Sequence, residues 1–470
     1  MPKMSTIEKA FSAEDFRKYG HELIDLLANH LENVSEEKTF PHQAPNEALD
    51  FWESDFKKPL SENPNDVFSE ILNKSVKLHH PHYMGHQVTP PAPLAALAGA
   101  FTGFVNNGMA LYEMGMAATP IERIVTDFIA QKIGYEPNGN GFLTSGGTIA
   151  TLTAILAARA AKSKTDVWQN GTEQKLAIMV SEEAHYCADR AARVMGLGSD
   201  GIIKVPANEH FQMRIDTLEV LFADAQQRGI EVFCVVASAC TTSTGSYDDL
   251  TAVADFCKKH QLWLHVDGAH GGAVVFSEKY NHLVKGIEQA DSVIIDLHKM
   301  LMLPALATAV LFKNPSDGYH TFQQKAHYLW SNQNAEDWFN VGKRSFECTK
   351  LMMGVKAYLL LRTYGEQLWQ ENIDTLHDLA QNFAELITKN PAFELAVWPQ
   401  SNIVCFRHIG KSENLNEHNT QIRQRLLEKG DFYIVQTNLR GQFYLRVSLM
   451  NPRTQTTDLV DLLKEIEALA

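Results

Sequence analysis

Two short stretches of this sequence end in residues that could do chemistry together. Leu262–Gly272 is an apolar run that reaches Asp267, and Ser292–Met300 is an apolar run that reaches Lys299. Runs of β-branched residues that stop at charged groups are typical of buried strands ending at the edge of a sheet. A lysine there can form a Schiff base with an aldehyde, and an aspartate facing a pyridine nitrogen keeps that nitrogen protonated. The pair therefore suits pyridoxal phosphate, while a buried Lys–Asp ion pair is the alternative interpretation.

A glycine pair marks a candidate phosphate site. Gly141-Phe-Leu-Thr-Ser-Gly-Gly-Thr148 leads directly into Ile149–Arg159, an alanine- and leucine-rich run that predicts a helix. Glycines followed by threonine at a helix start expose backbone N–H groups and a hydroxyl beside the positive end of the helix dipole. The pattern indicates a phosphate cradle, although an ordinary turn with a helix cap has the same residues.

Two further runs predict strands that are followed by polar groups. Leu176–Ser181 precedes His185, and Val232–Ala237 precedes Thr242. A lone histidine after a strand is more often a surface or core group than a functional one. Five groups, however, share one position at or just beyond the carboxyl ends of predicted strands, where open α/β sheets bind ligands. They are the glycine loop, His185, Thr242, Asp267 and Lys299. Their agreement predicts one shared site.

Bulk composition limits the class of protein. The chain has 470 residues, which favours two or three domains, and 45% hydrophobic with 21% charged residues is typical of a globular protein. A formal net charge of −14 and the absence of a Lys/Arg cluster argue against a nucleic-acid partner. Six cysteines without paired metal spacing predict no metal site, and reduced core thiols favour a cytoplasmic protein.

The N-terminal part shows no export or membrane signal. Its longest uncharged stretch, Val88–Val105, is interrupted by prolines, so we expect no membrane span. Ser12 and Asp15 predict a helix start, and apolar residues at helical spacing continue to Leu31. Such a wide apolar stripe needs a partner, which is either the core of the chain or a second subunit.

The pattern changes beyond about Gly342 and predicts a small α+β domain. Helices are expected at Leu351–Tyr364 and Thr457–Leu469, with strands at Ala396–Trp398, Asn402–Arg407, Phe432–Gln436 and Phe443–Leu449.

From about Pro81 to Pro452 the chain resembles the group II pyridoxal-phosphate-dependent amino acid decarboxylases. The stretches that carry the resemblance are Gly141–Arg159, Glu183–Tyr186, Thr241–Asp249, His265–Gly272 and Asp296–Lys299. The resemblance implies an α/β, aspartate-aminotransferase-like fold (PLP fold type I) in an obligate homodimer. It also implies an N-terminal helical segment that wraps the partner (1–85), a cofactor-binding large domain (86–345) and a small C-terminal α+β domain (346–470).

The resemblance also implies roles for individual residues. Lys299, Asp267 and His185 would be catalytic: the lysine would hold the cofactor, the aspartate would pair with its ring nitrogen, and the histidine would stack on its ring. The other expected cofactor contacts are Gly147, Thr148, Thr242, Ala269 and His298, and the expected substrate contacts are Arg446, Tyr83 and His86. For Arg446, pairing across the predicted sheet is an equal alternative. Gly268 and Asp296 depart from the residues usual in the family.

The expected reaction is decarboxylation of an L-amino acid to an amine and carbon dioxide. The candidate loop Tyr328–Val341 has no tyrosine after Tyr328, although family members commonly use a loop tyrosine to protonate Cα. The resemblance implies an aldehyde product where phenylalanine replaces that tyrosine, so Phe339 raises the alternative of an aldehyde synthase. The other possibility is that His185 or a bound water supplies the proton.

Three more distant alternatives remain. Val266–His270 also looks like a cysteine desulfurase, for which Cys348 is the candidate nucleophile. A nicotinamide enzyme is disfavoured because Thr144–Thr148 lacks three-glycine spacing. A non-catalytic cofactor-binding protein would retain the fold but not need both Lys299 and Asp267.

Overall fold

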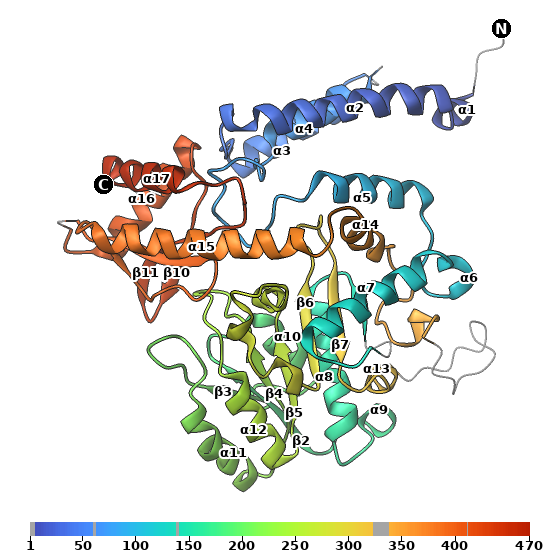
Figure 1. Ribbon diagram of the computed structural model, residues 1–470, viewed down its shortest axis with the longest axis vertical. Helices are drawn as coiled ribbons and strands as arrows, with labels where there is room; N and C mark the ends of the chain where they lie inside the picture. The colour runs from blue at the N-terminus through green and yellow to red at the C-terminus, as the bar shows by residue number, and fades with distance from the viewer. Residues whose placement is uncertain (1–4, 60–62, 138–140, 323–337, 411) are drawn as a thin grey trace. The chain divides into compact units, whose positions relative to one another are not determined.

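The computed structural model of this protein describes residues 5–59, 63–137, 141–322, 338–410 and 412–470. The chain divides into two units (Figure 1). The large unit consists of Gln87–Glu385 and Leu395–Cys405. The terminal unit consists of Met1–His86, Leu386–Glu394 and Phe406–Ala470, so both ends of the chain belong to the same unit.

Among the described residues, the large unit is built on a seven-stranded sheet with the order β1-β7-β6-β5-β4-β2-β3. The strands from β3 through β2, β4 and β5 to β6 pair in parallel, and β7 is antiparallel to both β6 and β1. All strands of this sheet except β7 therefore point their carboxyl ends to one edge. The bounds are β1 Gly141–Thr144, β2 Lys175–Ser181, β3 Ile202–Val205, β4 Ile230–Ser238, β5 Trp263–Asp267, β6 Ser292–Asp296 and β7 Thr308–Phe312.

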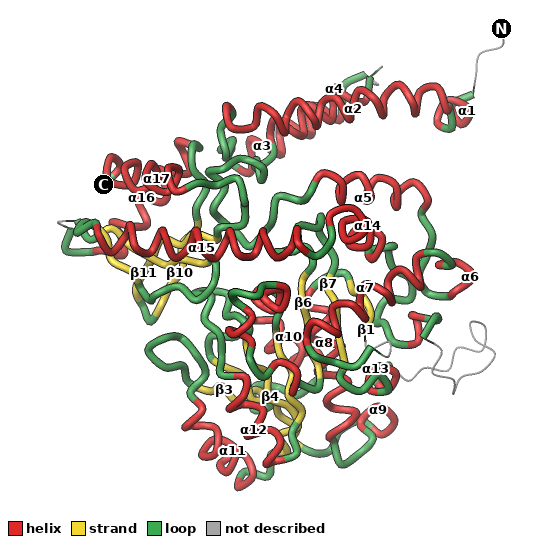
Figure 2. Tube along the Cα trace, viewed as in Figure 1, coloured by secondary structure: helices red, strands yellow, loops and turns green. Residues whose placement is uncertain are grey.

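The central strands form because their residues are apolar on both faces. Every residue of β5 and β6 is buried, which is the pattern of a parallel strand covered by helices on both sides. Figure 2 shows the yellow strands of the large unit among red helices. Helix α8, Gly147–Lys162, packs against the sheet through small side chains that allow a close approach. The core there includes Ala150, Ala154, Ala157 and Ala158 of α8 with Ile178, Val236 and Ile294 of the strands.

The other α-helices of the large unit precede, connect or follow these strands. Their bounds are α5 Pro93–Val105, α6 Tyr112–Gly115, α7 Ala118–Ile133, α9 Val167–Asn170, α10 Tyr186–Val194, α11 Leu218–Gln227, α12 Leu250–His260, α13 Asp317–His320, α14 Gly354–Tyr364 and α15 Gln367–Lys389, whose last turn belongs to the terminal unit. Within the described part of the chain, no helix is long and apolar enough to cross a membrane.

The terminal unit begins with helices and holds most of a four-stranded sheet of order β10-β11-β9-β8. The predicted helix start at Ser12 is confirmed, because its hydroxyl accepts a hydrogen bond from the backbone N–H of Asp15. The bounds in and around this unit are α1 Thr6–Ala10, α2 Ala13–Asn33, α3 Pro45–Phe56, α4 Pro64–Lys74, β8 Phe393–Leu395, β9 Ile403–His408, α16 Leu415–Lys429, β10 Val435–Leu439, β11 Gln442–Ser448 and α17 Thr456–Leu469.

Two of the predicted strands are misplaced. The expected strand Ala396–Trp398 is wrong: the strand is β8, Phe393–Leu395, and the chain bends at Ala396 and Val397, directly after the strand ends. The expected strand Phe432–Gln436 lies three residues too early. Its position is set by the hairpin turn at Arg440 and Gly441, where φ is 54° and 81°, because such a two-residue turn fixes the register of both strands.

Candidate active site

A cavity of about 290 Å³ lies at the carboxyl ends of the central strands. The structure brings together there all the residues for which a cofactor contact is predicted. These lining residues are Gly147, Thr148, His185, Thr242, Asp267, Ala269, His298 and Lys299. They converge because β5 and β6 end at the same edge of the sheet at which α8 and α10 begin.

Lys299 enters the cavity on the turn that follows β6. Its Nζ lies 3.0 Å from Oδ2 of Asp296, the last residue of that strand. Asp296 has a side chain only 4% exposed, and its Oδ1 accepts a hydrogen bond of 2.5 Å from the hydroxyl of Thr308. His298 Nε2 lies 3.7 Å from Oδ2 of the same carboxylate. Asp296 is therefore the residue around which the amine is oriented, although the sequence pattern singles it out only as a departure from the family.

The two charges of this ion pair shift each other's pKa. Burial works against ionisation of Asp296, but the charges of Lys299 and then His298 hold the pKa of its carboxyl below the ordinary value. Burial likewise works against the charged form of Lys299, but Asp296, followed by Asp267, raises the pKa of the amine above its ordinary value. Lys299 is therefore held as an ammonium group.

Asp267 ends β5 and presents its carboxylate to the same cavity. Its Oδ1 accepts a hydrogen bond of 3.2 Å from the backbone N–H of Ala269. The thiol of Cys187 lies 3.7 Å from Oδ2, and the hydroxyl of Thr151 lies 3.5 Å from that sulfur. Burial, followed by the charge of Asp267, raises the pKa of Cys187, so the thiol stays protonated. Cys187 was expected only as a core thiol, and its place two residues after His185 is the signal that was missed.

His185 caps the start of α10, where its Nδ1 accepts a hydrogen bond of 3.3 Å from the backbone N–H of Cys187. Burial lowers its pKa; the positive charge of Lys299 adds to this effect, while Asp267 opposes it. The structure therefore favours a neutral imidazole among the residues that line a cavity with an ammonium group and a carboxylate.

The start of α8 lines part of the cavity. Gly146, the N-cap residue, has φ of 125°, and as a glycine it has no side chain with which to cap the first backbone N–H groups of this 16-residue helix. A Cβ at Gly147 would lie 3.2 Å from Oδ1 of Asp296 and 3.7 Å from Cβ of Ala269, so only glycine fits there without displacing a neighbour. Free helix N–H groups, an amine and a separate carboxylate are the groups that bind a phosphorylated pyridine aldehyde, and the residues present fit pyridoxal phosphate.

The three predicted substrate contacts lie in the terminal unit and form a cluster of their own. The hydroxyl of Tyr83 donates to the backbone carbonyl of His86 at 3.4 Å, and the ring of Tyr83 stacks on Tyr433 with centroids 5.5 Å apart. Burial lowers the pKa of His86, and the charges of Arg446 and Arg423 lower it further. Sequence reasoning missed Tyr433 and Arg423, which no motif marks.

The candidate loop is only partly described. Tyr328 and the residues up to 337 lie outside the described residues. Phe339 is 36% exposed, and its ring centroid lies 5.8 Å from that of Tyr112 in an edge-on arrangement.

Comparison with known proteins gives consistent matches. The model of the pyridoxal-dependent decarboxylase conserved domain matches residues 54–409. An aromatic-L-amino-acid decarboxylase from Bacillus atrophaeus is 26% identical and covers 98% of this chain and 96% of its own length. An L-2,4-diaminobutyrate decarboxylase from Acinetobacter baumannii is 30% identical, over 85% of this chain and 82% of its own. The crystal structure of mouse CSAD superimposes with a TM-score of 0.88 at 26% identity, covering 95% and 97% of the two chains, which confirms the predicted fold class.

Proposed function

This chain belongs to the pyridoxal-dependent decarboxylase family, and we propose from that premise how its residues divide the work of the reaction. It is a carboxy-lyase that uses pyridoxal 5′-phosphate to convert an amino acid into an amine and carbon dioxide. The observation that best supports the assignment of residues is the convergence of Lys299 and Asp267, from two separate strands, on one cavity at the start of α8.

Bound pyridoxal phosphate supplies an electron sink for the electron pair that remains when carbon dioxide departs. Asp267 would keep the proton on the ring nitrogen, and its hydrogen bond from Ala269 fixes the direction in which its carboxylate points. Lys299 would hold the cofactor through Nζ and would release it to the substrate amine. Because Asp296 keeps Lys299 protonated, Asp296 also controls when that amine is free to act.

The phosphate would lie at the start of α8, against Gly147 and Thr148, with His298 beside them. The N-cap residue Gly146 offers these helix N–H groups no side-chain cap, so an anion would meet both the hydrogen-bond donors and the positive end of the dipole. His185 would stack on the face of the ring as a neutral imidazole, and Thr242 and Ala269 would complete the cofactor contacts.

The substrate-binding roles of Tyr83, His86 and Arg446 stay predictions. Relatives of this chain act on aromatic amino acids, on 2,4-diaminobutyrate and on cysteine sulfinate, and these substrates differ in size and charge. We therefore assign the substrate as an L-amino acid and no more narrowly. A screen of the common amino acids for release of amine and carbon dioxide identifies it.

An aldehyde synthase is the second candidate, because the candidate loop has Phe339 and no tyrosine after Tyr328. We favour decarboxylation, with His185 or a water as the source of the proton on Cα. Assaying products in air with the best substrate separates the two functions. One amine per carbon dioxide without peroxide supports the decarboxylase, whereas aldehyde, ammonia and peroxide would establish the synthase.

A cysteine desulfurase and a non-catalytic binding protein receive less support. Cys348 is exposed and is not among the described side chains that line the cavity. A protein that only binds the cofactor would have no need for the ion pair with Asp296 that orients the amine of Lys299.

We propose a homodimer in the cytoplasm as the working form. Several apolar side chains of α2 and α5 are exposed to solvent in the single chain, which is costly unless another surface covers them. These are Phe16, Ile24 and Leu27 of α2, and Leu97, Phe101 and Phe104 of α5. Light scattering should give twice the mass of the 470-residue chain. The proposed segments 1–85, 86–345 and 346–470 and the cytoplasmic location remain predictions.

A further inference from the structure

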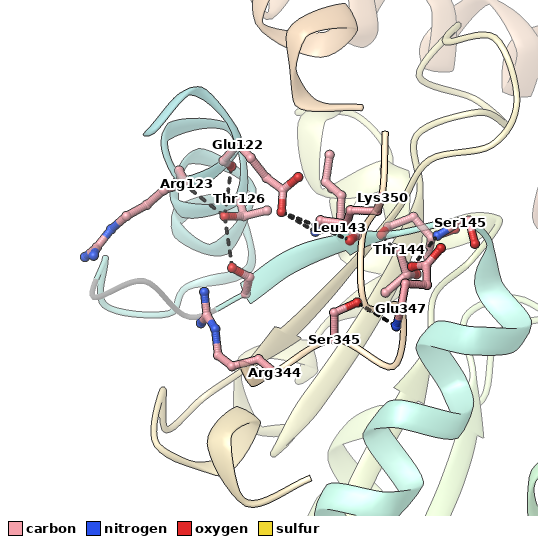
Figure 3. Close-up of polar contacts among 12 residues, drawn as sticks. Glu122, Arg123, Thr126, Leu143, Thr144, Ser145, Arg344, Ser345, Glu347 and Lys350 are labelled. Atoms are coloured by element: carbon pink, nitrogen blue, oxygen red, sulfur yellow. Dashed lines mark hydrogen bonds and ion pairs between the residues drawn. The ribbon is translucent and has the colours of Figure 1, made fainter. Parts of the chain in front are cut away.

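Strand β1 lies at the edge of the large sheet, and side chains take the place of a further strand beside it. The backbone N–H of Leu143 donates to Oε1 of Glu122, at 3.1 Å, and the Nζ of Lys350 donates to the carbonyl of Leu143, at 2.5 Å. Figure 3 shows both contacts meeting on the same residue of the strand. An edge strand that is held in this way cannot shift along its neighbour without breaking them.

Glu122 and Lys350 are themselves an ion pair buried in the large unit. Lys350 Nζ lies 2.5 Å from Glu122 Oε1. The side chain of Lys350 is 2% exposed and that of Glu122 is 3% exposed. Burial lowers the pKa of Lys350, and the charge of Glu122 opposes that effect. Burying two charges costs desolvation free energy that their attraction often fails to recover, so stability alone is a weak reason for this pair.

The contacts lie immediately before the turn that opens α8. Leu143 is followed by Thr144 and then by Ser145, whose backbone N–H donates to Oε2 of Glu347 at 3.4 Å. Glu347 and Lys350 come from one short segment before α14, while Glu122 comes from α7. None of these three charged residues is among the described residues that line the cavity.

We propose that Glu122, Lys350 and Glu347 are positioning residues that set where the first N–H groups of α8 meet the cofactor's phosphate. The proposal rests on the function proposed above, which assigns the phosphate to that turn. The residues act through the backbone of Leu143 and Ser145, so their loss should affect phosphate binding and leave the cofactor's ring contacts unchanged.

The test compares two probes, pyridoxal 5′-phosphate and pyridoxal, titrated into the cofactor-free full chain. In the double variant Glu122→Met/Lys350→Met, which removes both charges together and leaves Leu143 with neither side-chain contact, the Kd for pyridoxal 5′-phosphate should rise at least tenfold. The Kd for pyridoxal, which has no phosphate, should stay within twofold. Glu347→Ala should show the same selectivity with a smaller rise, and Glu347→Gln, which keeps an acceptor for Ser145, should restore binding.

Lys356→Met is the matched control. Counted over the whole residue, Lys356 and Lys350 are both 7% exposed, yet within the described residues Lys356 makes no hydrogen bond or ion pair. Its replacement should change neither Kd. If the double variant does not fold, the two Glu347 variants carry the test.

Different failures have different meanings. Equal losses for both probes, or no loss for either, would overturn the positioning role while leaving the proposed function intact. A wild-type chain that binds pyridoxal as tightly as pyridoxal 5′-phosphate would overturn the assignment of the phosphate to this turn, and the positioning proposal with it.

Discussion

Replacing Asp296 with asparagine tests how the large unit holds Lys299 before the cofactor binds. The change removes one charge of a pair separated by 3.0 Å, with side chains that are 4% and 21% exposed. The lysine would lose its nearest counter-charge, and because its side chain is 21% exposed the loss should not exceed about 3 kcal/mol, the lower end of the range for breaking a fully buried pair. With an unfolding entropy of about 2.1 cal/mol/K per residue, a unit of about 300 residues should lose up to ~5 °C in Tm.

The pH dependence of this loss follows from the directions of the two pKa shifts. The pKa of Lys299 is raised, so its contribution is present below the ordinary lysine pKa and is lost as the pH rises through the folded value. The pKa of Asp296 is lowered, so its contribution is present above the ordinary carboxyl pKa and is lost as the pH falls through the folded value. The destabilisation by Asp296→Asn should therefore be largest near neutral pH.

A double-mutant cycle on the cofactor-free protein provides the assay. Thermal unfolding is measured for Asp296→Asn, for Lys299→Met and for the double variant, which contains neither charge. The double variant should be more stable than the sum of the two single losses predicts. Losses that add within about 0.5 kcal/mol would show that the two groups do not interact, and would refute the reasoning.

The same variant has a consequence for cofactor capture. Lys299 must lose a proton before its nitrogen can attack an aldehyde, and Asp296 keeps that proton in place. The rate of covalent attachment should therefore reach its plateau at lower pH in Asp296→Asn than in the wild type. An unchanged pH profile would contradict the assigned role of Asp296.

Three further predictions concern the proposed roles. Borohydride should fix the cofactor to Lys299, as read by peptide mapping, and Lys299→Ala should bind it without attachment and lose nearly all turnover. Asp267→Asn should keep the fold but decarboxylate more slowly, because an opposite charge moves a ring-nitrogen pKa by about 1–3 units; wild-type turnover would count against the electron-sink role. Arg446→Met should raise KM more than it lowers kcat, since a lost bidentate contact costs about 1.5–3 kcal/mol. Unchanged kinetics with a lower Tm would instead favour pairing across the sheet.

Local pattern and topology agree at the carboxyl ends of the central strands. β5 and β6 are short buried runs, β5 ends at Asp267, and Lys299 lies on the turn three residues after the end of β6 at Asp296. Parallel strands bring such ends together at one edge, so the meeting of Asp267 and Lys299 is what the strand pattern predicts. The fold class and the family follow from the same stretches and are confirmed by the comparisons.

Contacts between distant residues could not be predicted in this way. Glu122 and Lys350 are 228 residues apart, and each by itself looks like an ordinary surface charge in the sequence. Tyr433, which lies against Tyr83, sits in a region where the predicted strand is misplaced by three residues. Such pairs depend on how elements pack, and a single sequence without a motif does not specify that packing.

Strand β7, which runs opposite to its neighbours β6 and β1, adds a residue to the site that the parallel strands do not supply. Because β7 runs opposite to β6 and β1, its first residue, Thr308, is paired in register with the last residues of both, Asp296 and Thr144. A parallel β7 would have placed Thr308 at the far edge of the sheet. The reversal instead puts its buried hydroxyl on the carboxylate that holds Lys299 and its backbone beside the entry to the α8 turn. The turn that carries Lys299 and the turn proposed to bind the phosphate are therefore joined through Thr308, a residue that no sequence pattern marks as functional.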